Sequence, residues 1–180
     1  MNRLSGLLVA TSVLVLGCAQ EPAEVTPAPV EYQAYGNLAQ VMRGIPFPAS
    51  NIIFDTQTTD PAAVAEPSDP GQDQGATAQF SGVYGGWQAV ENAALAIQET
   101  SNLIMIPGRM CENGKPVPND QEDFRMWAQN LANAGAEALK AAQSQDLDAM
   151  IDVSGTLSDA CAMCHEKYRD VPDNADRCTP

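Results

Sequence analysis

Apolar residues recur at helical spacing in two segments of the first half of the chain. The first segment runs from Tyr32 to Ile45, and Pro46 and Pro48 are expected to end this helix because proline disfavours helical geometry in the residue before it. Its apolar positions are Tyr35, Leu38, Val41, Met42 and Ile45. The second segment runs from about Phe80 to Ile106. Its apolar seam alternates steps of four and three residues, as in helices of a bundle, and comprises Val83, Trp87, Val90, Ala94, Ile97, Ser101 and Ile104.

Two further helices are predicted in the second half of the chain. Asn119 and Glu122 resemble a capping box at the start of the third helix, which is expected to end near Ser144. Asp146 is typical of an N-cap and is expected to start the fourth helix. The apolar face of the third helix comprises Phe124, Trp127, Leu131, Ala134, Ala138 and Ala141. That of the fourth comprises Leu147, Met150, Ile151, Leu157, Cys161 and Cys164.

Four amphipathic helices in sequence, without the sustained alternation typical of strands, predict an all-α fold. We expect an up-down four-helix bundle over residues 32–180, with a C-x-x-C-H motif near its C-terminus. Residues 55–79 contain almost no large apolar side chains and predict a long solvated loop. Trp87 and Trp127 lie on the apolar faces, so we interpret them as core residues rather than as an electron path.

The sequence Cys161-Ala-Met-Cys164-His165 has the spacing of covalent c-type haem attachment. On a helix the two thiols and the imidazole share one face. The thiols can therefore form thioethers to one porphyrin while His165, the only histidine in the chain, reaches the iron as proximal ligand. A C-x-x-C disulfide and chance spacing are the alternatives without a cofactor. Zinc is disfavoured because its sites need four ligands, and no second C-x-x-C is present.

The N-terminal residues are typical of an exported bacterial protein. Arg3 precedes a mostly apolar run that is too short to span a bilayer. The glycine and cysteine that follow resemble a lipobox, so residues 1–17 are interpreted as a lipoprotein signal peptide and Cys18 as the lipidated N-terminus of the mature protein. An ordinary signal peptide cleaved near Ala19, or an uncleaved apolar segment, is the alternative. By the same resemblance, alanine rather than aspartate after Cys18 favours the outer membrane.

The chain is strongly acidic. It has 9 Lys and Arg against 23 Asp and Glu, a net charge of −14 at pH 7, and loss of residues 1–17 would remove only Arg3 and change the charge to −15. Such a surface repels nucleic acid and favours a partner with a basic docking surface. Simple solubility explains the charge equally well. Residues 18–31 are rich in Pro, Ala and Glu and predict a flexible tether between the lipid and the bundle.

The position of the motif on the last of four helices resembles the cytochrome c-prime family, the class II c-type cytochromes. The resemblance covers about Tyr32 to Arg169 and is strongest at Cys161-Ala-Met-Cys-His-Glu-Lys-Tyr-Arg169. It implies one covalently bound haem c, with His165 as proximal iron ligand. The chain departs from the family in its lipobox, in its loop at 55–79 and in two further cysteines.

The resemblance also implies either a five-coordinate iron or a methionine ligand from the first helix. Met42 matches that position and lies on the apolar face that should meet the haem; the alternative is that it fills the core. Met42 lies about seven to ten residues into the expected helix, or on the order of 10–15 Å, which is farther from the bundle end than His165. Met105 and Met110 are the rival ligands. Arg169, one turn after His165, is a candidate contact for a haem propionate, and solvation is the alternative.

Cys111 and Cys178 are expected to form a disulfide. Of the five cysteines, Cys18 is assigned to lipid and two to the haem, which leaves this pair in an oxidising compartment. In an up-down bundle the two cysteines follow the second and fourth helices, which run in the same direction, so both should lie at one end of the bundle. Two free thiols and intermolecular pairing are the alternatives.

The preferred function is a periplasm-facing, lipid-anchored electron carrier with one haem c and His/Met axial ligation, rather than an enzyme. The alternative is a five-coordinate protein that binds NO or CO. A haem peroxidase is disfavoured because no second histidine is present to act as a distal acid–base group. The expected partners are a redox protein and the outer-membrane lipid that Cys18 carries, with no nucleic acid. A homodimer is left open.

Overall fold

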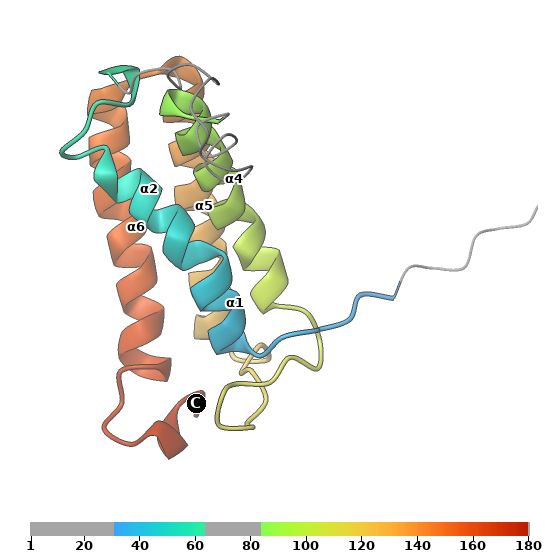
Figure 1. Ribbon diagram of the computed structural model, residues 1–180. Coiled ribbons are helices and arrows are strands. Elements are labelled where there is room, and N and C mark those ends of the chain that lie inside the picture. Colours follow the sequence, from blue (N-terminus) through green and yellow to red (C-terminus); the bar gives the residue numbers. More distant parts are fainter. Residues whose placement is uncertain (1–30, 64–83, 180) are drawn as a thin grey trace, which may run out of the picture. The chain divides into compact units, whose positions relative to one another are not determined.

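The computed structural model describes residues 31–63 and 84–179 (Figure 1). Its α-helices are α1 (Leu38–Gly44), α2 (Pro46–Asp55), α4 (Gly86–Ile104), α5 (Glu122–Ser144) and α6 (Leu147–Tyr168), and short 3-10 helices span Pro61–Ala63 and Asn174–Asp176. Within these two ranges there is no β-strand, only one isolated bridge between Met110 and Pro116. The predicted all-α fold is therefore confirmed for the described residues.

The helices alternate in direction. Figure 1 shows the chain running along the bundle through α1 and α2, back through α4, forward through α5 and back through α6. α4 packs on α5, α5 on α6 and α2 on α4. This order places α1, the end of α4, the start of α5 and the end of α6 together, and we call this the motif end of the bundle. None of the helices in the described ranges is long and apolar enough to cross a membrane.

The first helix begins later than the apolar pattern predicts. Asn37 caps α1 with a capping box: its side chain accepts a hydrogen bond from the backbone N–H of Gln40, and the Gln40 side chain accepts one from the backbone N–H of Asn37, both at 2.9 Å. Tyr35, expected on the apolar face, lies before the helix and is 92% exposed. The two reciprocal hydrogen bonds favour a start at Leu38 because they satisfy N–H groups that the first helical turn leaves without partners.

The first helix ends just before Pro46 and Pro48, as predicted, but a second helix that was not predicted begins at Pro46 itself. Only Ile45 departs from helical geometry, with φ −124° and ψ −71°, and Pro46 is the first residue of α2. Proline is tolerated there because the first N–H groups of a helix have no partner inside it. The first arm of the bundle therefore consists of two helices, α1 and α2, joined at Ile45.

α1 is held by the segment that joins α4 to α5. No residue of α1 is fully buried. The backbone N–H of Leu38 donates to the carbonyl of Met110 at 2.8 Å. Arg109 is 4% exposed and donates to the carbonyls of Leu103, at 2.9 Å, and Gly36. The residues that precede α1 are thereby fixed to the end of α4.

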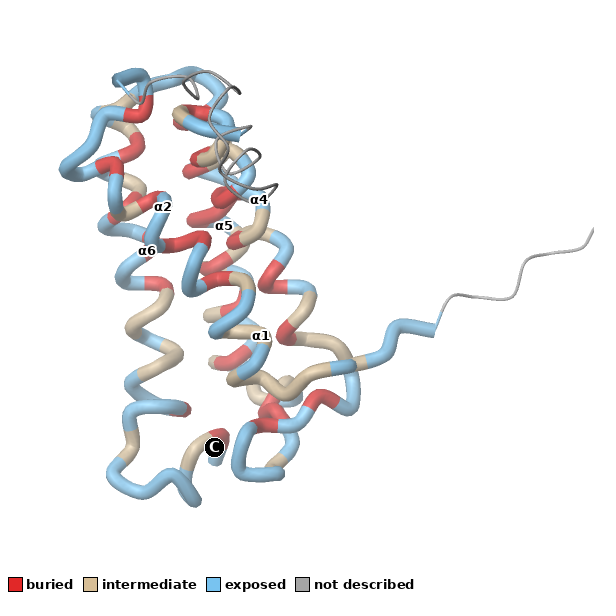
Figure 2. The backbone as a smooth tube through the Cα atoms, viewed as in Figure 1, coloured by how far each residue is buried: buried red, intermediate tan, exposed pale blue. Residues whose placement is uncertain are grey.

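The main core is built on the seam predicted for the second helix. Every described member of that seam is buried on α4, whereas Val83 lies outside the described residues. The predicted faces of α5 and α6 pack against it through Leu131, Ala134, Ala138, Ala141, Met150 and Leu157. A Cβ atom at Gly135 would lie 2.6 Å from the backbone nitrogen of Gln98, so glycine is what allows α5 to approach α4 this closely. Figure 2 shows that the buried positions face the inside of the bundle.

The start of α5 corrects the prediction from Asn119. Gln121, rather than Asn119, is the N-cap, and it makes no side-chain capping hydrogen bond. The carbonyl of Asn119 instead accepts a hydrogen bond from Arg125 at 3.4 Å, as does that of the next residue. The side chain of Arg125, in the first turn of α5, therefore holds the residues that precede the helix but does not cap its N–H groups.

The boundary between α5 and α6 is confirmed. α5 ends at Ser144, and the side chain of Asp146 accepts a hydrogen bond from the backbone N–H of Ala149 at 3.0 Å, as an N-cap does. The expected start of the second helix near Phe80 and most of the predicted loop 55–79 lie outside the described residues, and α4 is described from its first residue onward.

Candidate functional site

A largely apolar cavity of about 610 Å³ lies at the motif end of the bundle. Its lining comes from α1, α2, α5, α6 and the end of α4, together with two segments outside the helices, residues 111–113 and 174–178. The volume falls within the range of protein cavities that hold cofactors and other small molecules. Every α-helix in the described ranges therefore contributes to the lining of this cavity.

The three residues of the C-x-x-C-H motif line this cavity. Cys161, Cys164 and His165 lie in the last two turns of α6, where a spacing of three and four residues places them on one face. All three are half-buried. The helix thus brings two thiols and one imidazole to the same wall.

The thiols are held in their protonated form. Burial raises the pKa of Cys164 to about 12, and the nearby thiol of Cys161 and carboxylate of Asp123 add to the effect. Burial also raises the pKa of Cys161, although the positive charge of Arg169 opposes the shift. The two cysteines are not bonded to each other. Neither is a reactive thiolate at neutral pH in the folded chain, and both are free for attachment.

The imidazole is held in its neutral form. Burial is the largest cause that lowers the pKa of His165; the guanidinium of Arg169 lowers it further, and the carboxylate of Asp170 opposes both. The neutral ring is the form that binds a metal ion. The surroundings of His165 therefore suit a ligand rather than a proton carrier.

Met42 lines the same cavity, whereas neither Met105 nor Met110 is among the described residues that line it. Because α1 begins at Leu38, Met42 is the fifth residue of the helix. The expected mismatch in height with His165 assumed a helix start near Tyr32, and the later start places Met42 nearer the beginning of its helix. Of the three candidate methionines, only Met42 shares the cavity with the motif.

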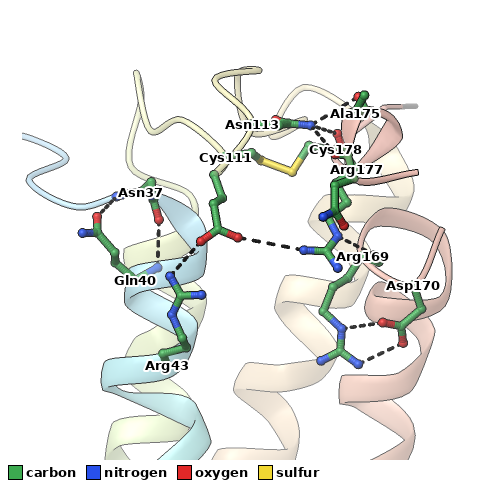
Figure 3. Close-up of polar contacts among 12 residues, drawn as sticks. Asn37, Gln40, Arg43, Cys111, Asn113, Arg169, Asp170, Ala175, Arg177 and Cys178 are labelled. Atoms are coloured by element: carbon green, nitrogen blue, oxygen red, sulfur yellow. Dashed lines mark hydrogen bonds and ion pairs between the residues drawn. A yellow bond between two sulfur atoms is a disulfide. The ribbon is translucent and has the colours of Figure 1, made fainter. Parts of the chain in front are cut away.

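A disulfide closes the motif end of the bundle. Cys111 and Cys178 are joined, with an S–S distance of 1.94 Å and 6.6 Å between their Cα atoms. The side-chain amide of Asn113 donates to three carbonyls of the C-terminal tail, those of Asn174, Ala175 and Arg177, at 3.0, 3.3 and 2.9 Å (Figure 3). The tail and the 111–113 segment therefore form one fixed wall of the cavity.

Aromatic side chains form another part of the wall. The ring of Tyr168 makes edge-on contacts with Phe124 and Trp127, with centroids 5.5 and 5.8 Å apart. All three line the cavity. Trp87 is buried in the core as expected. Trp127 is only partly buried and packs against a second, smaller cluster of buried residues, which includes Phe124 and Tyr168. Sequence reasoning did not single out Tyr168, although it lies one turn after Cys164.

Arg169, the candidate propionate contact, lines the cavity but already has a partner. Its guanidinium donates two hydrogen bonds to the carboxylate of Asp170, at 2.6 and 2.9 Å. Sequence reasoning missed two other arginines in the lining, Arg43 and Arg177, which approach the carboxylate of Glu112 at 3.0 and 3.9 Å. Contacts between residues so far apart in the sequence leave no periodic signal that could have revealed them.

The family model described as Cytochrome C' matches residues 112–169. The matched segment contains α5, α6 and the C-x-x-C-H motif. This segment is therefore similar to the cytochrome c-prime family. Cytochrome c-prime proteins bind haem c, carry electrons or bind gases, and are typically periplasmic. No curated protein and no solved structure matches the chain. Met42 and Arg177 lie outside the cytochrome c-prime match, and so do both cysteines of the disulfide.

The residues around the cavity fit the haem c of the cytochrome c-prime family. Two uncharged thiols and a neutral imidazole on one helix face match the residues that attach such a group and bind its iron. The apolar lining suits the porphyrin ring, and the thioether of Met42 adds a second candidate iron ligand. The donor set is therefore that of a c-type cytochrome.

Proposed function

We propose that this protein is an electron carrier with one haem c bound in the motif-end cavity. Cys161 and Cys164 would attach the haem through thioether bonds, His165 would be the proximal iron ligand and Met42 the sixth ligand. When bound, the haem iron supplies a one-electron change between its ferric and ferrous states. The observation that carries the proposal is that the motif and Met42 line the same cavity, which no other candidate methionine does.

The side chains in the cavity wall favour electron transfer over exchange of ligands at the iron. Phe124, Trp127 and Tyr168 pack against one another in the cavity wall, and the disulfide fixes the end of the cavity. Such a wall limits the movement of the side chains that form it. A thioether is a soft ligand that favours the ferrous state and raises the reduction potential. Together these features suit a change of oxidation state with little rearrangement.

The alternative is a five-coordinate haem protein that binds NO or CO. It would use the same cysteines and the same histidine and would differ only in leaving Met42 unbound. The spectrum of the holoprotein separates the two functions. A low-spin spectrum with the weak far-red charge-transfer band of iron–thioether ligation supports the electron carrier. High-spin bands would overturn it in favour of gas binding.

Covalent attachment has its own test. The protein is produced together with a c-type cytochrome maturation system, and its haem is extracted with acid and acetone. We expect the haem to remain on the wild-type protein and to be released from, or absent in, a variant that carries both Cys161→Ala and Cys164→Ala. Haem that extracts cleanly from the wild type would show that the proposed function is wrong.

We also infer that the protein is anchored by a lipid on Cys18 in the outer membrane and faces the periplasm. The support is the positive Arg3 followed by an apolar run and Gly17-Cys18, together with a disulfide, which requires an oxidising compartment. Residues 1–30 lie outside the described part of the structure. Processing of the wild type should be sensitive to globomycin. A Cys18→Ser variant that stays in the membrane fraction would contradict the anchor.

The proposed partner is a redox protein with a basic docking surface. The reason is the net charge of −14, which attracts positive surfaces. Salt screens this attraction and reduces its range. The same charge repels nucleic acid, so no nucleic-acid partner is proposed. A reaction rate with the partner that does not fall as salt rises would contradict this proposal. Sedimentation of the holoprotein would decide between a monomer and a homodimer.

A further inference from the structure

Three arginines line the cavity at the motif end, in a chain that has 9 Lys and Arg against 23 Asp and Glu. They come from three places in the sequence: Arg43 from α1, Arg169 from the residue after α6, and Arg177 from the C-terminal tail. The rest of the cavity lining is largely apolar. A cavity of this kind suits a ligand that is apolar over most of its surface and carries anionic groups at one edge.

The three arginines differ in how many of their N–H donors already have an acceptor. Arg169 forms a two-pronged ion pair with the neighbouring Asp170. Arg43 donates one hydrogen bond, to Glu112 at 3.0 Å. Arg177 donates its Nε–H to the carbonyl of Arg169 at 2.9 Å, while its Nη1 lies 3.9 Å from Glu112, beyond hydrogen-bond distance. Because a guanidinium has five N–H donors, most donors of Arg43 and Arg177 have no partner among the described residues.

The position of Arg177 is fixed by its neighbours. Cys178 follows it and is bonded to Cys111, which precedes Glu112, so the disulfide places Arg177 beside Glu112. The side-chain amide of Asn113 donates to the carbonyl of Arg177 at 2.9 Å, and this hydrogen bond restrains the backbone of the tail at that residue. Figure 3 shows Arg43 on α1 and Arg177 on the tail, linked through the carboxylate between them.

We propose that Arg43 and Arg177 together bind the propionate carboxylates of the haem, a role that rests on the proposed haem-binding function. Glu112 holds the two guanidinium groups near each other, and their free donors take the carboxylates. Arginine suits this role because its planar fork matches the two oxygens of a carboxylate. Since Arg177 lies beyond residues 112–169, the family match does not imply this contact. The disulfide-bonded tail is thereby a part of the cofactor site.

The test is resonance Raman spectroscopy of the holoprotein, in which the propionate-bending band reports hydrogen bonding to these groups. Arg43→Gln and Arg177→Gln are compared with Lys140→Gln, which removes the same charge from an exposed residue near the far end of α5. We expect the band to fall in frequency in both arginine variants and to stay unchanged in the control. The reduction potential should fall in the arginine variants alone, because a positive charge near the iron is lost.

The outcomes separate this inference from the proposed function. An unchanged propionate band in both arginine variants, with covalent haem retained, would overturn the arginine site and leave the proposed function standing. A wild-type protein without covalent haem would overturn both. If Arg177→Gln does not fold, Arg177→Lys replaces it: lysine keeps the charge but not the fork, so the band should still move, and an unmoved band counts against the site.

Discussion

Tyr168 donates a hydrogen bond from its hydroxyl group to the carboxylate of Asp123 at 2.8 Å, which ties the last residue of α6 to the first turn of α5. Lys167 pairs with the other oxygen of the same carboxylate. Asp123 therefore receives two donors from the end of the helix that carries the C-x-x-C-H motif. The orientation of that helix end depends on the ionisation of one aspartate.

This contact predicts a specific dependence of stability on pH. The hydrogen bond from Lys167, and then that from Tyr168, lower the pKa of Asp123 below its ordinary value of 3.8. A carboxyl group whose pKa is lowered by folding stabilises the folded state above its unfolded pKa, and this contribution is lost as pH falls through the folded pKa. Asp123→Asn should therefore lower the melting temperature at neutral pH, with a difference from wild type that shrinks in acid.

The measurement is thermal unfolding of the holoprotein across the acidic to neutral range. Asp159→Asn is the control, because Asp159 is exposed on α6 and has no ion pair among the described residues. It should leave the melting temperature near that of wild type. A deficit for Asp123→Asn that is the same in acid as at neutral pH would contradict the pH argument.

The disulfide should make a large contribution to stability. It joins residues 67 positions apart, and the chain-entropy relation for a loop of this length gives about 4 kcal/mol, less any strain. A variant with both Cys111→Ala and Cys178→Ala should lose free energy of unfolding of this order in a denaturant titration. Denatured but unreduced wild-type holoprotein should show no free thiol, and reduction should release two. Two reactive thiols before reduction would be inconsistent with the bond.

Substitution of Met42 should change the spin state of the iron. If its thioether is the sixth ligand, Met42→Ala should convert a low-spin spectrum to a high-spin one and lower the reduction potential, because a soft ligand of the ferrous state is lost. Met105→Ala is the matched control, since Met105 packs near the cavity without lining it. A change of spin state in Met105→Ala, with Met42→Ala unaltered, would move the ligand to Met105.

Replacement by alanine should change the free energy of unfolding in opposite directions at Gly135 and Gly155. A Cβ atom at Gly135 would meet the backbone of Gln98 at 2.6 Å, so Gly135→Ala should force α4 and α5 apart and cost about 1–3 kcal/mol. At Gly155 on α6 a Cβ atom meets nothing within 4 Å, so Gly155→Ala should stabilise by about 0.5–1 kcal/mol through helix propensity. Denaturant unfolding measures both. Equal effects of the two substitutions would show that the close approach does not limit packing.

Periodic and local signals account for what the sequence could predict. The seam from Trp87 to Ile104 repeats with the period of a helix, so its burial on α4 followed directly. Asp146 acts on a backbone group three residues away, and such a cap can be recognised without knowledge of the fold. The placement of the motif on the last turns of a helix follows from the same periodicity.

The predictions that were incomplete or wrong concern residues that can play two structural roles, and residues whose partners lie far away in the sequence. Pro46 ends one helix in isolation but begins another once Ile45 supplies the bend. Asn119 has the side chain of a cap, yet Arg125 binds its carbonyl and α5 starts later. Asn113 was not recognised, because its three acceptors lie at the far end of the sequence and only the folded chain brings them near.

The short helix that carries Met42 owes its place to the segment after α4 rather than to the main core. Its backbone is held through Leu38 and Met110, its preceding residues through Arg109, and its last turn through the ion pair of Arg43 with Glu112. The contacts that place Met42 are therefore separate from those that hold the main core. If Met42 is the iron ligand, as proposed, a change confined to Glu112 would loosen the helix that carries its thioether while the disulfide and the core of α4, α5 and α6 stay in place. Under the proposed function, the segment that holds α1 would therefore tune the redox potential independently of the helical core.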